Sequence, residues 1–293
     1  MLTRRDKIVL GLMVGIPAFI HILFVWVPTI SSVILSFTSW NGIGGLDKIK
    51  FVGLKNYVDL VTIYDSFWPA VLHNIIWLAV LIFIATPIGM FLAVLLDKNI
   101  RGSRLYQSVL FTPVVLSLAI VGFIWQLQYA PEQGFLNNLL GTTRQDNLID
   151  WLGNKDINLW AVLVAASWRH VGYIMVLYLA GLKSVDPTLK EAASIDGASE
   201  RQTFFQVIFP VLRPINLIIL VVTVIEALRA FDLVYVINRG RNGLELLSVL
   251  VTQNIVGESQ RIGFGSAIAV ILLSISVVPI IIFLRRALSE EPE

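Results

Sequence analysis

Two long apolar segments of the sequence carry side chains that could recognise a ligand or transfer a proton inside a membrane. They are Arg169, His170 and Tyr173 in residues 159–182, and Glu226, Arg229 and Asp232 in residues 215–236. In the second segment the ionisable residues are three apart, which places them on one stripe of a helix. A charge at membrane depth costs about 3 kcal/mol or more, so each of these residues is a candidate functional group.

The chemistry of these side chains suits a ligand with several hydroxyl groups. Glu226 can accept hydrogen bonds from two vicinal hydroxyls, Arg169 can donate from its planar fork, and Tyr173 can stack on an apolar sugar face. A structural alternative is an ion pair between Arg169 and Glu226 that holds two helices together. Arg229 and Asp232 could form a second such pair. The residues alone leave both interpretations open.

A proton-coupled secondary transporter is a second functional hypothesis, in which His170, Glu226 and Asp232 relay protons. It explains the buried charges, but not the polar loop that separates the two segments. A membrane-embedded enzyme is disfavoured, because the chain has no cysteine and its histidines are scattered at positions 21, 73 and 170. It also has no GxxxxGK[ST] phosphate-binding sequence. We therefore expect neither a bound metal nor ATP hydrolysis by this chain.

The composition of the chain requires a lipid bilayer. Of the 293 residues, 56% are hydrophobic and 14% are charged, whereas about 25% of the residues of a soluble domain are charged. The mean hydropathy is +0.79, and the net charge of +2 is too small to indicate nucleic-acid binding. Six stretches can each supply the roughly 20 helical residues that cross a bilayer. They are residues 8–31, 71–96, 105–127, 159–182, 215–236 and 264–284. The predicted fold is all-α, with six transmembrane helices in one domain over residues 1–293.

The distribution of Lys and Arg predicts the orientation of these spans. Residues 1–7, 97–104, 183–213 and 285–293 hold Lys and Arg at more than twice their density in the loops at the other ends of the spans. Because cytoplasmic loops are enriched in Lys and Arg, we expect both termini in the cytoplasm. The first span is too long for a signal peptide, and no small-residue cleavage site follows it, so we expect it to be retained.

The predicted cytoplasmic loop over residues 186–214 carries signals for two short helices joined by a tight turn. Asp186 can cap the first helix, and Gly197 suits the left-handed conformation that ends it. Residues 199–202 form a capping box for the second helix, which Pro210 helps to close. The loop also has an apolar set that must pack on the membrane domain or on a partner. It comprises Leu189, Ala192, Ala193, Phe204, Phe205 and Ile208.

The order of residues in this loop resembles the EAA loop of permeases of binding-protein-dependent ABC importers. The matching residues are Glu191-Ala192-Ala193, Gly197 and the hydrophobic ending Val207-Ile208-Phe209-Pro210. The family usually has Ile and Leu where this chain has Val207 and Phe209, which is a conservative difference. The surrounding sequence is similar to the sugar-importer branch typified by maltose-type permeases, from the region of Phe51 to that of Arg286.

The resemblance implies a coupling role for the loop, between transmembrane helices 4 and 5. It implies that the loop docks on one of two partner ATPase subunits, which would bind the ATP and Mg²⁺, so that this chain needs no cofactor. The other implied partners are a second, homologous but different permease, an extracytoplasmic solute-binding protein, a carbohydrate and membrane lipid, in the bacterial inner membrane. The residues implied in coupling are Glu191, Ala192, Ala193, Asp196, Gly197, Ala198, Phe204 and Pro210.

The same resemblance implies a carbohydrate site near mid-membrane. Its candidate residues are Val114, Ser117, Leu118, Arg169, His170, Tyr173, Glu226, Ala227, Arg229 and Ala230. Some sugar permeases have polar residues where this chain has Ala227 and Ala230, so the ligand need not be maltose. Glu226 would repel a phosphorylated ligand, which favours a neutral disaccharide, oligosaccharide or glycosyl-polyol.

Two further groups of residues have structural interpretations. His73 and Asn74 begin the second span near the predicted outer face, where we expect them to act as interfacial caps. Gly122, Gly181 and Gly265 are expected at close contacts between helices.

Overall fold

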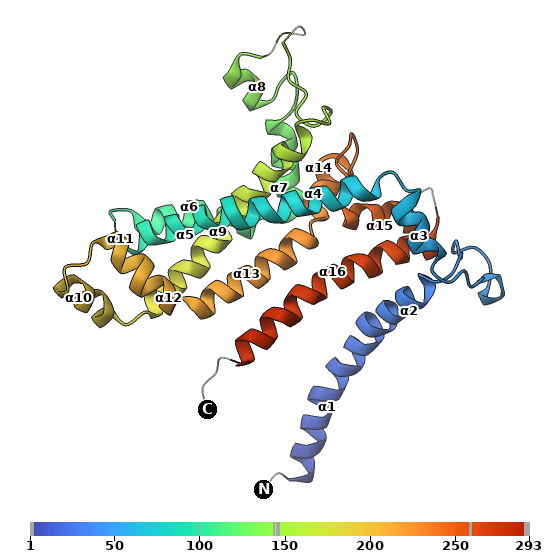
Figure 1. Ribbon diagram of the computed structural model, residues 1–293, viewed down its shortest axis with the longest axis horizontal. Coiled ribbons are helices and arrows are strands. Elements are labelled where there is room, and N and C mark those ends of the chain that lie inside the picture. Colours follow the sequence, from blue (N-terminus) through green and yellow to red (C-terminus); the bar gives the residue numbers. More distant parts are fainter. Residues whose placement is uncertain (1–2, 99, 143, 145–146, 258–259, 290–293) are drawn as a thin grey trace. The chain divides into compact units, whose positions relative to one another are not determined.

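The computed structural model describes residues 3–98, 100–142, 144, 147–257 and 260–289, and its regular secondary structure there is helical (Figure 1). An isolated antiparallel bridge joins Thr38 and Phe51. The helices are α1 (Arg4–His21), η1 (Ile22–Trp26), α2 (Val27–Leu35), η2 (Leu46–Lys48), α3 (Lys55–Thr62), α4 (Phe67–Val80), η3 (Leu81–Ala85), α5 (Thr86–Asp97), α6 (Ser103–Val115), α7 (Leu118–Gln128), α8 (Phe135–Leu140), α9 (Asn158–Ser184), α10 (Pro187–Ile195), α11 (Glu200–Gln202), η4 (Thr203–Ile208), α12 (Phe209–Val211), α13 (Arg213–Leu228), α14 (Asp232–Asn238), α15 (Leu247–Ile255) and α16 (Ile262–Ser289). Two compact units divide the chain, one of Met1–Phe67 with Leu250–Leu273 and one of Trp68–Val249 with Ser274–Glu293.

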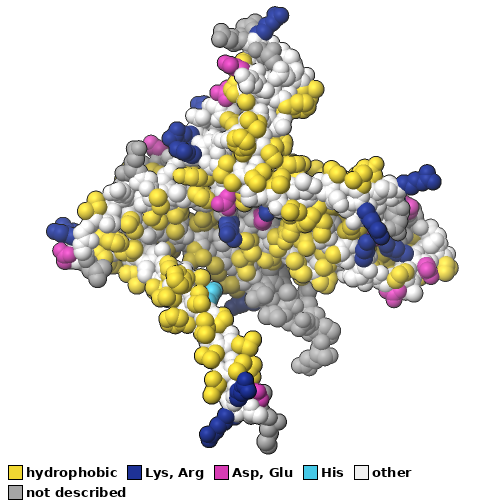
Figure 2. Space-filling model, turned by 180° about the vertical axis from the view of Figure 1, so that it is seen from behind, with side chains coloured by type: hydrophobic (Ala, Val, Ile, Leu, Met, Phe, Trp, Pro, Cys, Tyr) yellow, Lys and Arg dark blue, Asp and Glu magenta, His cyan; other side chains and the backbone are white. Residues whose placement is uncertain are grey.

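Several helical stretches of the described chain are long and apolar enough to cross a membrane. Four do so singly: Arg4–Leu35, Phe67–Asp97, Asn158–Ser184 and Ile262–Ile281. Two bent pairs, Ser103–Val115 with Leu118–Gln128 and Glu200–Val211 with Arg213–Asn238, raise the number to six if each pair is one span. Hydrophobic side chains cover much of the helical surface seen in Figure 2. The prediction of an all-helical, multi-pass membrane protein is confirmed for the described residues.

The prediction of unbroken helices over residues 105–127 and 215–236 was wrong. The first is broken at Leu116 and Ser117, where the axis turns by 101°. The Ser117 hydroxyl accepts a hydrogen bond from the backbone N–H of Ile120 and so begins α7. The second is interrupted between α13 and α14, over residues 229–231. Hydropathy does not detect such breaks, because a broken span keeps the same apolar residues when protein or a cavity surrounds the break.

Prolines account for the three π-helical stretches of the described chain. The stretches η1, η3 and η4 each end two residues before a proline, at Pro28, Pro87 and Pro210. Proline lacks the backbone N–H, and its ring clashes with the carbonyl four residues earlier. A wider turn before the proline accommodates both defects. The helices therefore continue through these three positions.

In the first unit, Asn56 of α3 organises the segment that follows α2. Its Nδ2 donates to the carbonyls of Ser36 and Thr38 at 2.7 and 2.8 Å. The Asn56 side chain is buried, so both bonds are shielded from water. They hold Thr38 in position for its bridge to Phe51.

In the second unit, α9 is the central helix. It packs against α5 and α6 along much of its length and also contacts α13 and α14. A Cβ added at Gly181 of α9 would lie 3.0 Å from Ile215 of α13, and one added at Gly122 of α7 would lie 2.7 Å from Val236 of α14. Both glycines therefore permit close helix contacts, as predicted. In the first unit, Gly265 has a similar contact with Ile255 at 2.5 Å.

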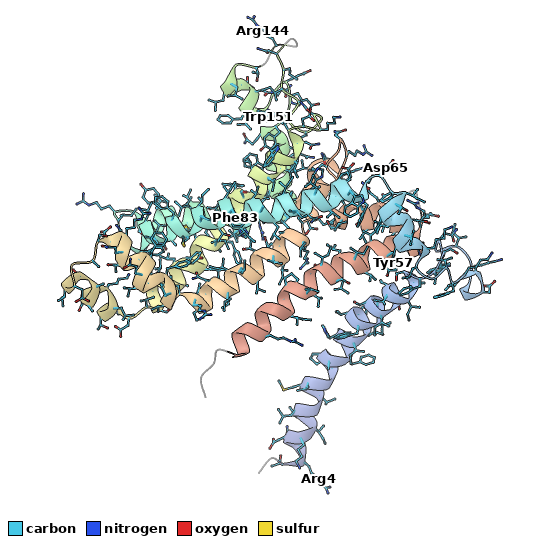
Figure 3. The ribbon with its side chains drawn as sticks, in the orientation of Figure 1. Arg4, Tyr57, Asp65, Phe83, Arg144 and Trp151 are labelled. Carbon is cyan, nitrogen blue, oxygen red and sulfur yellow. The ribbon has the colours of Figure 1, made fainter. Side chains whose placement is uncertain are left out.

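The segment between α7 and α9 is organised around the fully buried amide of Asn137. Asn137 Nδ2 donates to the carbonyls of Pro131 and Ile149 at 2.7 and 2.8 Å. Its Oδ1 accepts from Trp151 Nε1 at 2.8 Å and from the Thr142 hydroxyl at 3.1 Å. Trp151 is labelled in Figure 3, close to α8. The full hydrogen-bonding capacity of the amide is used, which ties the two ends of the segment together.

We expect Asn137→Leu to lower the free energy of unfolding of this segment by about 2–4 kcal/mol, because it leaves buried carbonyls and an indole N–H unpaired. Limited proteolysis of the inserted protein should show faster cleavage between residues 138 and 157. The control is Asn138→Leu, since Asn138 is exposed and its amide bonds, among the described residues, to the nearby carbonyl of Gly134. Equal cleavage of the two variants would contradict the role of Asn137.

Candidate functional site

The two helices of the 186–214 loop begin at the predicted capping residues. Asp186 Oδ1 accepts from the backbone N–H of Thr188 at 2.9 Å, and this hydrogen bond holds the pKa of Asp186 below its ordinary value. Ser199 and Gln202 form a reciprocal capping box at the start of α11. Negative charge and side-chain acceptors at these positions satisfy backbone N–H groups that have no partner within a helix. The predicted helix–turn–helix is confirmed.

The turn between the two helices depends on Gly197, which has a φ of +75°. The N–H of Ala198 donates to the carbonyl of Ala193 at 3.0 Å, and the N–H of Gly197 donates to that of Ser194 at 3.1 Å. These two bonds form a Schellman motif, which ends a helix with a residue in the left-handed conformation. The motif sets the direction in which the chain leaves α10.

Two ion pairs join the loop to the end of α5. Lys190 Nζ lies 2.8 Å from Asp97 Oδ2, and Lys98 Nζ lies 2.6 Å from Glu200 Oε2. Exposed pairs of this kind contribute about 0–1 kcal/mol each. They orient the loop, which lies at the end of the bundle of α5, α6 and α9 (Figure 1).

The apolar residues of the loop divide into a packed group and an exposed group. Ala193 and Ile208 are buried, and Leu189 and Phe204 pack against a core cluster that also contains Met175 and Leu182 of α9. The exposed apolar group comprises Ala192, Ile195 and Phe205, and the charged Glu191 is exposed beside Ala192. The loop is therefore anchored on one face and presents a partly apolar face outward, and such a face is typical of a docking surface.

A cavity of about 290 Å³ lies in the second unit, where the two interrupted helices meet. It is lined by Trp77, Leu81, Leu118, Ala166, Arg169, His170, Ile225, Glu226, Arg229, Ala230, Phe231, Asp232 and Leu233. Leu118 follows the first break, and residues 229–231 form the second. Interrupted helices are found inside membrane proteins where they line a cavity or a substrate site.

Arg169 and Glu226 face each other in this cavity. Arg169 Nη1 lies 3.2 Å from Oε2 and 3.4 Å from Oε1 of Glu226. Strong charge-assisted pairs are shorter, at about 2.7–2.9 Å, and are often bidentate. The buried Nε of Arg169 has no hydrogen-bond partner among the described residues. The side chains of Arg169 and Glu226 are 22% and 36% exposed, so their terminal groups can still bind a ligand in the cavity.

The hydrogen bonds of His170 in the described chain are to two threonine hydroxyls. Its Nε2 lies 3.3 Å from the hydroxyls of Thr86 and Thr223, and its side chain is 2% exposed. The Thr223 hydroxyl donates to the carbonyl of Ile219 at 2.7 Å, so it can only accept from His170. We therefore assign the proton of the neutral ring to Nε2. These contacts do not form a relay from His170 to Glu226.

The predicted site residues fall into two groups. Those that line the cavity are Leu118, Arg169, His170, Glu226, Arg229 and Ala230, together with Asp232 of the relay hypothesis. Those outside it are Val114, Ser117, Tyr173 and Ala227. Tyr173 packs against the cluster beneath the loop, and Ala227 is buried in the cluster around Trp77. No ion pair joins Arg229 to Asp232 in the described chain.

Several residues in and around the cavity are not predicted by the sequence. Trp77 and Phe231 supply the aromatic surface of the cavity, a role that the sequence predicts for Tyr173. Thr223 holds His170, and its position three residues before Glu226 on the same helical stripe was an available signal. The Gln126 amide donates to the carbonyls of Val236 and Ile237 at 2.8 Å each, and so fixes α14 against α7. No sequence signal indicated that contact.

His73 and Asn74 bind backbone rather than serving only as interfacial caps. His73 Nδ1 lies 2.9 Å from the carbonyl of Glu245. Asn74 Oδ1 accepts from the N–H of Leu247 at 3.0 Å, and its Nδ2 donates to the carbonyl of Ala227 at 3.4 Å. The two residues tie the segment before α15 to α4, beside the interruption that follows α13.

Comparison with known proteins defines the class. Residues 85–291 match the family described as the inner membrane component of binding-protein-dependent transport systems. The match covers more than half of the chain, so the chain belongs to this family. It is a multi-pass membrane subunit of a transport system, and the proton-coupled carrier is not supported.

Individual relatives agree with this assignment. The chain is 32% identical to the probable ABC transporter permease protein YurN of Bacillus subtilis over 282 residues, which cover 94% of each chain. It is 35% identical over 262 residues to the xylose/arabinose import permease protein XacH of Haloferax volcanii, covering 88% of this chain and 81% of the relative. A chain of a bacterial ABC transporter involved in alginate import has the same fold, with a TM-score of 0.82 at 17% identity over 99% of this chain and 98% of that one.

Proposed function

We propose that this chain is the permease subunit of an ABC importer and forms the translocation pathway for a neutral carbohydrate. The observation that carries the proposal is the cavity at the two helix breaks, where the partly exposed Arg169 and Glu226 can donate hydrogen bonds to and accept them from a polyol. The formal charges of the cavity sum to zero, because Arg169 and Arg229 balance Glu226 and Asp232. A cavity without net charge favours a ligand without net charge. The relative named for xylose and arabinose import supports a sugar.

In this proposal an extracytoplasmic binding protein delivers the sugar, and ATP hydrolysis on two separate subunits drives its passage. The exposed face of the 186–214 loop docks on an ATPase subunit in the cytoplasm, and both termini lie on that side. In Figure 1 the end of α5, the start of α6 and the loop lie together at one end of α9, and α8 lies at its other end, as this topology requires. A second, different permease completes the pathway.

The experiment is uptake by proteoliposomes that contain the complete transporter. Thermal shift of the partner binding protein first identifies the sugar, beginning with pentoses and short oligosaccharides. We expect uptake of that sugar to require both the binding protein and ATP, and to be insensitive to collapse of the proton gradient. Uptake that continues without the ATPase subunits but stops when the gradient collapses would overturn the proposal.

A further inference from the structure

A second large cavity of the same unit, of about 620 Å³, lies between α5 and the 186–214 loop. It shares no lining residue with the cavity around Arg169 and Glu226. Its apolar wall is formed by Met90, Phe91 and Val94 of α5 and by Phe205 and Ile208 of η4. Phe205 also belongs to the exposed face of the loop, whereas Glu191, Ala192 and Ile195 of that face lie outside this cavity.

The apolar wall is open to the outside. Phe91 is 60% exposed and Phe205 is 52% exposed, although both are large aromatic residues. The helical rise makes the wall between Met90 and Asp97 about 10 Å long. An accessible apolar groove of this size with polar groups at one end is typical of a ligand site.

Charged side chains occupy one end of the cavity. Asp97 pairs with Lys190, and Lys98 pairs with Glu200. Arg201 is exposed and belongs to none of the ion pairs formed within the described chain. The rim thus carries three cationic side chains and two carboxylates, and the Arg201 guanidinium is the cation without an ion pair in the described chain. The ligand that fits is apolar along most of its length and anionic at one end.

We propose that this cavity binds an anionic phospholipid of the cytoplasmic leaflet. The lipid phosphate contacts Arg201 and also Lys98, which keeps its ion pair with Glu200. The acyl chain lies along Phe91, Val94 and Phe205. Basic residues at the cytoplasmic end of transmembrane helices attract anionic headgroups. The choice of the cytoplasmic leaflet rests on the proposed function, which places the loop in the cytoplasm. Bound there, the lipid would bridge α5 and the loop that meets the ATPase.

The test is retention of lipid by the assembled transporter. The complex is reconstituted in equal parts of phosphatidylglycerol and phosphatidylcholine, re-extracted in mild detergent, and its bound lipids are counted by native mass spectrometry. Arg201→Gln should lower phosphatidylglycerol retention about fivefold, whereas Arg104→Gln, an exposed arginine of α6 outside the cavity, should leave it unchanged. Glu200→Gln should raise retention, because it releases Lys98.

Filling the apolar part gives an independent test. Val94→Trp should displace the acyl chain, whereas Leu95→Trp, at an exposed neighbouring position of α5 outside the cavity, should not. Variants are compared at equal amounts of intact complex. Unchanged retention in both Arg201→Gln and Val94→Trp overturns the proposal, as does equal loss of phosphatidylcholine. If an ATPase subunit rather than a lipid covers the cavity, phosphatidylglycerol retention will be the same in all variants, and the proposal is likewise overturned. Because no transport is measured, failure of the proposed sugar import would not change this readout.

Discussion

Replacing Gly197 with valine is expected to lower ATP-driven sugar uptake about 5- to 30-fold while the permease remains inserted and assembled with its ATPase subunits. A β-branched residue is strained at a φ of +75°. A Cβ at this position meets no atom within 4 Å, so the strain acts on the backbone rather than through a clash. Relief of the strain requires loss of the Schellman bonds to Ala193 and Ser194, which changes the angle at which α10 meets its partner. Uptake and ATP hydrolysis are measured together in proteoliposomes, and hydrolysis should persist.

Two matched variants test whether the effect is specific to coupling. Gly197→Asn should retain coupled uptake, because asparagine tolerates the left-handed conformation. Gly141→Val places the same residue at the end of α8, where φ is +72° and a Cβ again meets nothing within 4 Å. It should leave coupling intact. Normal uptake by Gly197→Val would remove the docking role, and an equal defect in Gly141→Val would indicate general destabilisation.

Replacing Glu226 with alanine is expected to reduce sugar uptake about 10- to 100-fold, since hydrogen bonds to a charged acceptor contribute about 1.5–3 kcal/mol. Binding-protein-stimulated ATP hydrolysis should fall much less, because the 186–214 loop is untouched. Glu132→Ala, an exposed carboxylate outside the cavity, is the control and should alter neither activity. Parallel loss of uptake, hydrolysis and protein level in Glu226→Ala would favour a structural ion pair with Arg169.

The double variant Arg169→Gln with Glu226→Gln separates the two roles further. Removing both members of a structural pair leaves no unpaired charge, so protein level and uptake should recover relative to the single variants. If the pair contacts the sugar, protein level should recover but uptake should not. The long, single-nitrogen contact of 3.2 Å between the two side chains leads us to expect the second result.

The sequence by itself determined the features that rest on local signals. Its apolar content required a membrane, and its hydropathy located the long apolar helices. The caps at Asp186 and Ser199 and the left-handed Gly197 could be predicted because each depends on backbone groups within a few residues. The order of residues around Glu191 indicated the transporter family, which the family match then confirmed.

Only the tertiary structure decided where the spans are interrupted and which side chains meet. The carbonyl of Ala230 accepts from the Ser248 hydroxyl, and Gln126 binds the carbonyls of α14, so contacts with residues distant in sequence hold the second interruption. Because of the interruptions, Phe231 rather than Tyr173 lines the cavity. Helical periodicity assumes an unbroken axis and therefore could not place these residues, whereas the tertiary hydrogen bonds that end one helix and begin the next do.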